Sequence, residues 1–410
     1  MPAVSSSPIA AAFDELAGQV PRPVGGPVTV TDRERRALAG ALASVPDPRA
    51  RRGVRYPFVP ILVVAACATL AGARSFAAIG EWVADLSAEA RASLGLVGRI
   101  PGPVTIWRVL IGVDRAALEA AVGAWIRARL QDAAGGQPAR SGRVWRVLAV
   151  DGKALRATGH GTDPVHLLGA LDHARGVVVA QVDVDAKTNE IPLFSTLLDQ
   201  IDDLTDVVVT ADAMHAQTGH ADYLHSRGAH LLVTVKRNQP TLHARLKALP
   251  WKGVPVGHTA AGRGRGRIEK RVLKAVTVPA GLGFPHAAQA IQVIRRTRPT
   301  KRRGHWRTET VYAICTLPAE HAQPAELAGW IRGHWSIENR LHWIRDVTFG
   351  EDLHQARTGS GPQVMAALRN LAISLLRLAG HTNIARALRH HARHPDQAIA
   401  LVTSTDTTTK

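Results

Sequence analysis

The chain has 410 residues, 46% of them hydrophobic and 20% charged, which excludes a wholly disordered chain and leaves room for two or three domains. Its 51 Lys and Arg residues exceed its 33 Asp and Glu residues, so the net charge of +18 suggests a polyanionic partner, either nucleic acid or an anionic membrane surface. Two cysteines, Cys67 and Cys315, are too few for a disulfide framework or a cysteine-based zinc site. The longest apolar run, residues 58–73, is shorter than the roughly 20 residues of a membrane span, and the first residues lack signal-peptide features. We therefore expect a cytoplasmic protein with no membrane partner.

The N-terminal third is predicted to be a loosely ordered leader over residues 1–30 and a helical domain over residues 31–131. After a first helix that opens near Asp32, its helices are expected over 57–72, 75–85, 87–95 and 105–130. Residues 74–86 and 103–114 could form a helix-turn-helix DNA reader, with Thr105 capping the second helix and Arg108 facing outward, or belong to a plain helical bundle. Residues 132–143 have the composition of a linker.

The remainder of the chain reads as an α/β domain over residues 144–380. Strands are expected over 144–152, 165–172, 176–185, 206–212 and 229–236, and helices over 190–202, 215–227, 325–345 and 362–379. This order predicts a mixed sheet with helices on its faces. Residues 250–316 read as a separate β-rich insertion, and residues 381–410 as a C-terminal helix and polar tail.

Two aspartates end strongly apolar predicted strands, Asp151 in VLAVDG and Asp212 in VVVTADA. A carboxylate at the end of a buried strand is costly unless it is hydrogen-bonded or binds a cation. Either residue alone could be a turn or helix-capping residue. If the two strands lie side by side, both carboxylates meet at one edge of the sheet.

Glu338 is a third candidate, in the aromatic segment 330–352. Two aspartates and a glutamate are hard oxygen ligands suited to Mg²⁺ or Mn²⁺ in phosphodiester chemistry. In helical register Glu338 lies four residues after His334 and four before His342, and these histidines could instead mark a zinc site, although the paired aspartates fit magnesium better.

These motifs resemble the DDE transposases of bacterial insertion sequences, of the H-repeat-associated type. The matching pieces, in order, are DPRARRGVRYP (47–57), LAGARSFAAIGEW (70–82), AVDGKALR (149–156), KTNEIP (187–192), VVVTADAMHAQ (207–217), LVTVKRNQPTL (232–242), GRIEKR (266–271) and HWSIENRLHWIRDVTFGED (334–352). The resemblance maps the acidic triad of the family to Asp151, Asp212 and Glu338. It implies an RNase-H-like core that uses Mg²⁺ or Mn²⁺ to cut element ends and join them to target DNA, as a homodimer or larger assembly on DNA. The chain departs from the family's wider signature around the glutamate, because Ile331, His334 and Arg345 replace its Tyr, basic residue and Lys.

Basic residues concentrate in the insertion. Residues 263–307 contain thirteen Arg or Lys against Glu269 alone, a net charge of +12, with Trp306 available to stack on an unpaired base. A solvated basic loop is the alternative reading. The residues predicted to contact double-stranded DNA here are Arg263, Arg265, Arg267, Lys270, Arg271, Lys301, Arg302 and Arg303.

Four further residues are predicted to hold or position a DNA phosphate near the triad, namely Lys153, Lys236, Asn238 and Arg345. Surface positions without a role are the alternative for Lys153 and Arg345. Two other functions stay open from the sequence: a catalytically inactive DNA-binding relic of an insertion sequence, and a metal-dependent nuclease without strand transfer.

Overall fold

A computed structural model describes residues 32–52, 54–135, 145–158, 164–185, 187–264, 266–300 and 305–403. Within these ranges the chain forms two compact units. Unit 1 comprises residues 145–149 and 203–335, and unit 2 comprises residues 32–135, 150–202 and 336–403. The predicted leader and most of the predicted linker lie outside the described residues.

Unit 2 begins with six helices: α2 (Asp32–Ala43), α3 (Phe58–Leu70), α4 (Phe76–Asp85), α5 (Ala88–Ser93), α6 (Pro103–Leu110) and α7 (Arg115–Gly135). The apolar run of the sequence is α3, which is buried on nearly every side against α2, α4 and α12 (Gly361–Leu378). None of the helices in the described ranges combines the length and apolar character needed to cross a bilayer.

Two expectations for this region are wrong. The single helix over 105–130 is divided into α6 and α7, because the Asp114 carboxylate accepts hydrogen bonds from the Ala116 and Ala117 N–H groups and starts a new helix. The helix-turn-helix reading also fails in detail, because α5 separates α4 from α6 where that motif has a short turn. The second helix starts after Gly102, with Pro103 in its first turn, so Thr105 is not its cap, although Arg108 is exposed as expected.

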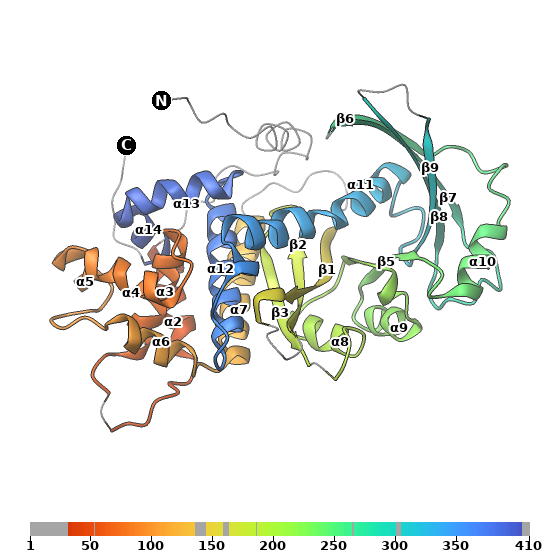
Figure 1. The fold of residues 1–410 in the computed structure, drawn as a ribbon. Helices are drawn as coiled ribbons and strands as arrows, with labels where there is room; N and C mark the ends of the chain where they lie inside the picture. Colours follow the sequence, from red (N-terminus) through yellow and green to blue (C-terminus); the bar gives the residue numbers. More distant parts are fainter. Residues whose placement is uncertain are drawn as a thin grey trace. The chain divides into compact units, whose positions relative to one another are not determined.

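The sheet of unit 2 consists of β2 (Val165–Asp172), β3 (Val178–Val184) and the second part of β1 (Arg146–Leu155), in the order β3-β2-β1. β2 and β3 are antiparallel, and α7 and α12 pack against β3. Figure 1 shows these strands next to the two helices. α8 (Leu193–Leu198) packs on β2 and β3. β1 is shared between the units, since residues 146–149 belong to unit 1 and residues 150–155 to unit 2.

Unit 1 has strands in the order β4-β5-β9-β8-β7-β6, with the first part of β1 beside β4. β4 (Val207–Ala211) and β5 (His230–Val235) are parallel, and α9 (Thr218–Ser226) lies between them in sequence. The expected order β-β-β-α-β-α-β over β1–β5 is therefore confirmed.

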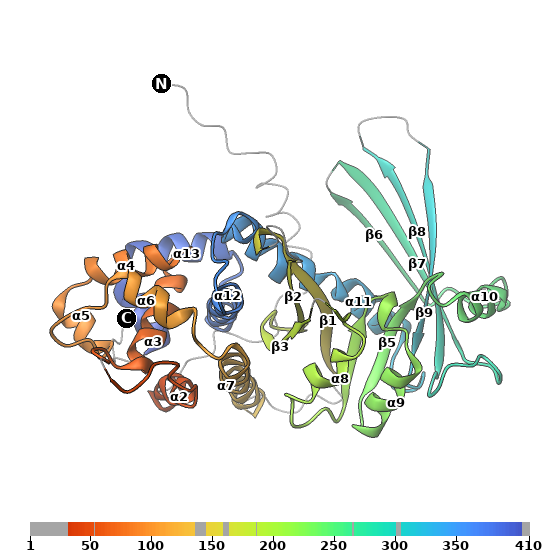
Figure 2. The ribbon, with the colours of Figure 1, turned by 60° about the horizontal axis from the view of Figure 1, so that its bottom comes forward.

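The predicted β-rich insertion forms four long strands, β6 (His258–Gly264), β7 (Arg267–Thr277), β8 (Gln289–Pro299) and β9 (Arg307–Cys315). Figure 2 shows them side by side. They are not a separate sheet, because β9 pairs antiparallel with β5 and so extends the sheet of unit 1. α10 (Pro240–Ala248) packs against β9, and α11 (Pro324–His334) packs against β4, β6 and β7.

The expected helix over 325–345 is interrupted. α11 ends at His334, and two short π-helices follow, η3 (Glu338–His342) and η4 (Ile344–Thr348). α12 then fills the core of unit 2, followed by α13 (Ile384–Arg393) and α14 (Pro395–Val402), where one terminal helix was expected.

Candidate active site

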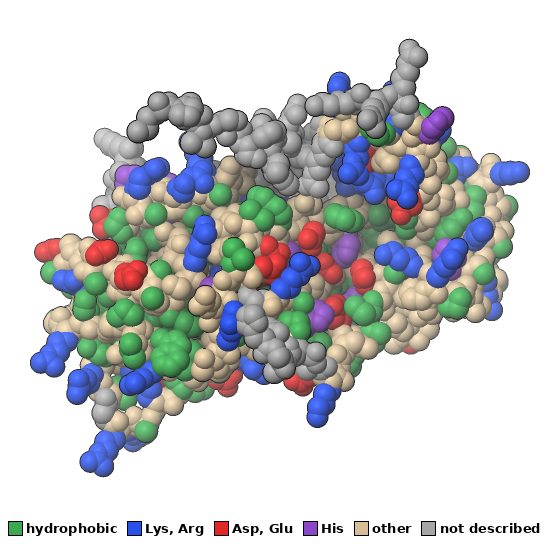
Figure 3. Space-filling view, in the orientation of Figure 1, with side chains coloured by type: hydrophobic (Ala, Val, Ile, Leu, Met, Phe, Trp, Pro, Cys, Tyr) green, Lys and Arg blue, Asp and Glu red, His purple; other side chains and the backbone are tan. Residues whose placement is uncertain are grey.

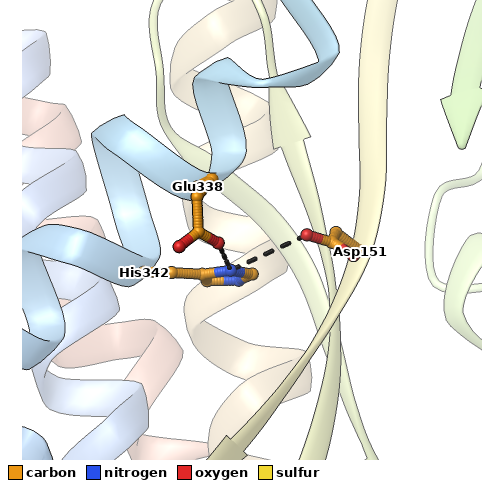
Figure 4. A group of neighbouring side chains, drawn as sticks. All are labelled: Asp151, Glu338 and His342. Carbon is orange, nitrogen blue, oxygen red and sulfur yellow. Dashed lines mark hydrogen bonds and ion pairs between the residues drawn. The ribbon is translucent and has the colours of Figure 1, made fainter. Parts of the chain in front are cut away.

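Asp151, Glu338 and His342 meet in unit 2 although they come from distant parts of the sequence (Figure 4). Nδ1 of His342 lies 3.1 Å from Oε2 of Glu338 and 3.8 Å from Oδ2 of Asp151. One ligand atom from each of the three residues lies within 4.8 Å of the other two. The imidazole is buried, whereas the Glu338 side chain is 52% exposed and that of Asp151 is 30% exposed, so both carboxylates are accessible to a ligand.

The strand β1 places Asp151. Residues Leu148, Ala149 and Val150 are fully buried and anchor the strand in the core. The next position leaves the apolar interior, and Oδ1 of Asp151 accepts a hydrogen bond from the Gly152 N–H at 3.0 Å. Two carboxylates from different elements thus face one another, an arrangement that a divalent cation stabilises and that is otherwise repulsive.

The space beside Gly152 is filled by two side chains that a larger residue would have to displace. A Cβ atom there would overlap the carboxylate of Glu190 and lie 2.6 Å from Nε2 of His166. His166 Nε2 and Glu190 Oε1 are 3.0 Å apart, so this polar pair covers the backbone beside Asp151. The sequence marked KTNEIP only as part of the resemblance, and nothing in it pointed to this contact.

A second polar pair joins the π-helix η4 to β1. Nζ of Lys153 lies 2.6 Å from Oδ1 of Asp346, and the lysine side chain is 8% exposed. Lys153 therefore ties η4 to β1, and this contradicts the expectation that it is available to a DNA phosphate. His334, the other histidine of the alternative zinc reading, belongs to unit 1, where its Nδ1 lies 3.2 Å from Oγ1 of Thr210.

The electrostatics keep Glu338 ionised. Its hydrogen bond with His342 lowers the pKa of the Glu338 carboxyl below its usual range, and the nearby charges of Lys153 and Arg156 act in the same direction. At neutral pH this residue is a carboxylate and hence a metal ligand of the hard oxygen type.

Arg345 has a structural role. Its guanidinium is 1% exposed, and Nε donates to Oε2 of Glu351 at 2.8 Å, while Arg369 Nη1 donates to Oε1 of the same residue at 2.7 Å. Burial would raise the pKa of Glu351, but the two guanidiniums outweigh it and lower this pKa to about 2. The expectation that Arg345 holds a backbone phosphate is therefore wrong, because the side chain is enclosed beneath the π-helices. Glu351 is likewise too buried to take part in chemistry.

Asp212 belongs to unit 1 and follows β4 directly. Its carboxylate accepts the Met214 N–H at 2.9 Å and caps the short 3₁₀ helix η2 (Ala213–His215). Nδ2 of Asn238 donates to the Ala213 carbonyl at 2.6 Å, so Asn238 supports the loop that carries Asp212. Lys236 is exposed at the end of β5. The approach of Asp212 to Asp151 and Glu338 stays a prediction.

The insertion has two chemically different faces at its outer end. Direct cross-strand partners lie on the same face of a sheet, and the register pairs Lys270 with Arg296 and Ile268 with Arg298. The cationic groups of Lys270, Arg296 and Arg298 lie 5.7, 5.5 and 5.0 Å from the ring centre of Trp306. We call these four residues the basic face. Figure 3 shows Lys and Arg side chains over these strands, with Asp and Glu side chains among them.

The opposite face carries a cluster of ion pairs. Glu269 pairs there with Arg271 and with Arg295, and Glu309 lies 3.8 Å from Arg295. Of the residues predicted to bind DNA, Lys270 is on the basic face, Arg271 is in this ion-paired cluster, and Arg263 and Arg267 are exposed. The others lie outside the described residues, namely Arg265, Lys301, Arg302 and Arg303. In the sequence analysis Arg296 and Arg298 contribute only to the net charge of the insertion, because the sequence does not show which basic residues share a face of its strands.

Comparison with known proteins gives consistent results. A family profile described as "Transposase DDE domain" matches residues 144–375, and one described as "DDE_Tnp_1-associated" matches residues 39–126. "Putative transposase YncI" of Escherichia coli O157:H7 is 27% identical over 359 residues, which cover 83% of this chain and 87% of the relative. "H repeat-associated putative transposase YhhI" of Escherichia coli K12 is 25% identical over 362 residues, which cover 84% and 91%.

The piggyBac transposase in a synaptic complex with hairpin DNA aligns with 96% of this chain and 86% of its own, at a TM-score of 0.38 and 9% identity, which is too weak to establish a shared fold. The DDE-domain match, which covers more than half of the chain, implies the RNase-H-like fold, and the mixed sheet with flanking helices agrees with it. The chain belongs to the family of transposase DDE-domain proteins.

Proposed function

We propose that this chain is a DNA transposase that cleaves DNA at the ends of its element and joins the resulting 3′-hydroxyls to target DNA. Asp151, Asp212 and Glu338 are the catalytic and metal-binding residues of this proposal. The observation that carries it is the meeting of Asp151 and Glu338 within ligand distance of one another, with both carboxylates exposed.

The donors fit Mg²⁺ or Mn²⁺. Carboxylate oxygens are the ligands that hard divalent cations prefer, and Glu338 is held ionised by its neighbours. When bound, such a cation would activate a water or a 3′-hydroxyl and stabilise the leaving oxygen. The protein's own contribution is to fix the carboxylates: β1 and its Lys153–Asp346 pair hold Asp151 against η3, and the capped loop after β4 holds Asp212.

DNA contact is proposed for the basic face of the insertion. Its cations are exposed and crowd around one aromatic ring, an arrangement that suits phosphates beside a base. Lys236, at the end of β5, and the exposed Arg263 are proposed to extend this contact. Arg267 is also exposed and is proposed to contact DNA from the face of Glu269 and Arg271. The N-terminal helical domain is a further candidate, since α6 exposes Val104, Trp107 and Arg108.

Two paired element ends require at least a dimer on DNA, and this assembly is part of the proposal. Because the substrate is double-stranded DNA, we place the protein at the bacterial nucleoid. We propose that the domain division predicted from the sequence serves this reaction. It consists of a helical N-terminal domain, a linker, a catalytic domain with a basic insertion and a C-terminal segment.

The product distribution tests the proposal. The full chain is incubated with a labelled duplex that carries the inverted repeats flanking its gene, an unlabelled target plasmid, and Mg²⁺ or Mn²⁺. A transposase gives end-specific nicks and labelled strand-transfer products. Nicks without joining would indicate a nuclease, and binding without either product would indicate a non-catalytic relic; each result would overturn the proposal.

A further inference from the structure

We infer that His342 is a direct ligand of the cation held by Asp151 and Glu338, so that this half of the metal site has two oxygen donors and one nitrogen donor. The inference rests on the proposed function, because it needs a metal at these carboxylates. It lies wholly within unit 2.

The donor spacing supports coordination. Two donors about 2.1 Å from one cation lie about 3 Å apart when they are adjacent in an octahedron and about 4.2 Å apart when they are opposite. The imidazole nitrogen lies 3.1 Å from Glu338 and 3.8 Å from Asp151, both within that window. The carboxylate oxygens of Asp151 and Glu338 are separated by no more than 4.8 Å, so a small contraction brings all three donors around one ion.

The helix geometry directs both side chains to this point. Glu338 and His342 are the first and last residues of the π-helix η3, and the Trp343 N–H donates to the Glu338 carbonyl five residues earlier. π-helical turns are rare, and they occur frequently at functional sites. The wider turn presents the carboxylate and the imidazole together, while His342 is 4% exposed and therefore enclosed against the carboxylates.

The other nearby groups already have partners. Lys153 neutralises Asp346, the next acidic residue along the helix after His342. His334, which the sequence placed on the same face, belongs to unit 1 and contacts Thr210 of that unit. His342 is thus the imidazole that the structure brings to the two carboxylates.

Coordination has chemical consequences that differ from those of a hydrogen bond. It requires the Nδ1 lone pair, so the proton that Nδ1 donates to the Glu338 carboxylate in the metal-free site is replaced by the cation, and the ring proton is then on Nε2. An imidazole donor favours transition metals such as Mn²⁺ over Mg²⁺, whereas a hydrogen-bonded histidine that only orients Glu338 gives no such preference.

Pulsed electron paramagnetic resonance of Mn²⁺ bound to the full chain tests this directly. The parent protein, prepared with ¹⁴N- and with ¹⁵N-labelled histidine, should show the coupling of a coordinated imidazole nitrogen that changes with the isotope. His342→Gln should lose this coupling and bind Mn²⁺ at least about tenfold more weakly, with a smaller loss for Mg²⁺. His391→Gln is the matched control, since His391 is 5% exposed in the same unit but lies on α13, and it should keep the coupling.

The spectrum of Mn²⁺ bound to the parent protein tests coordination by His342 even if the His342→Gln variant fails to fold. Bound Mn²⁺ without a histidine nitrogen coupling, together with loss of Mn²⁺ binding in Glu338→Gln, would overturn the role of His342 and leave the proposed function standing. Absence of Mn²⁺ binding by the parent protein would overturn both.

Discussion

The buried Glu351 carboxylate should be a main electrostatic support of unit 2. Its pKa of about 2, against an ordinary value of 4.5, corresponds to about 3 kcal/mol of stability at roughly 1.36 kcal/mol per pKa unit. Because the pKa is depressed in the folded state, this stability is complete above pH 4.5 and is lost as the pH falls from 4.5 towards 2. Glu351→Gln removes the charge and leaves Arg345 and Arg369 buried without a counter-ion, so we expect destabilisation by about 3–5 kcal/mol at pH 7.

Urea unfolding of the full chain, followed by far-ultraviolet circular dichroism, measures this effect, because most helices lie in unit 2. The control is Asp47→Asn, which breaks the more exposed pair between Asp47 and Arg49 and should cost less than about 1 kcal/mol. The difference between parent and Glu351→Gln should also shrink as the pH is lowered below 4.5. A Glu351→Gln protein as stable as the Asp47→Asn control at pH 7 would show that the Glu351 carboxylate does not stabilise unit 2.

Three further outcomes follow from the site and the insertion. Replacing Arg296 and Arg298 by Gln should flatten the slope of log DNA affinity against log salt concentration by up to about 1.8, at about 0.9 per lost phosphate contact. The control Arg271→Gln, on the ion-paired face, should leave this slope unchanged. Equal slopes in both variants would contradict DNA contact by the basic face. Gly152→Ala should destabilise unit 2 by about 1–3 kcal/mol in the same urea assay, because the new methyl group displaces the Glu190 and His166 side chains. Gly169→Ala is the control, since the space beside Gly169 is open, and equal stability of the two variants would contradict this packing. Asp212→Asn should abolish strand cleavage while DNA binding persists, and retained cleavage would exclude it from the triad.

The fold could be read from the sequence to the extent that it depends on local pattern. The apolar runs before Asp151 and Asp212, with the turn residues between the other runs, predicted the order of β1–β5, because period and turn residues are local signals. The expected end of the first strand at Asp151 is wrong, since β1 continues to Leu155. The pairing of β9 with β5 was missed because it joins segments far apart in the chain, so the sequence marked the insertion only as a separate β-rich segment. The break in the helix after His334 was missed because a π-helix has no sequence signal of its own and depends on tertiary contacts.

The roles of the basic residues illustrate a second limit. A guanidinium in the sequence carries the same charge whether it is buried or exposed, and Arg345 and Lys153 were read as DNA contacts when both are enclosed by carboxylates. Conversely, the separation of Lys270 from Arg271 onto opposite faces of β7 follows from strand alternation once the register is known. The net charge of the sequence identifies the basic insertion, but only the contacts in the structure show which of its side chains can reach DNA.

Comparison of Glu338→Gln with the parent protein, on the same labelled element-end duplex, tests the central claim most directly. The substitution keeps the shape of the side chain but removes a negative charge from the metal ligands, so cation affinity and stabilisation of the reacting oxygens should fall together. DNA affinity depends on Lys and Arg contacts elsewhere and should not fall. We expect a variant that shifts the duplex in a gel like the parent protein yet neither nicks nor joins it in Mg²⁺ or Mn²⁺. Cleavage at the parent rate would contradict the assignment of Glu338 as a catalytic ligand.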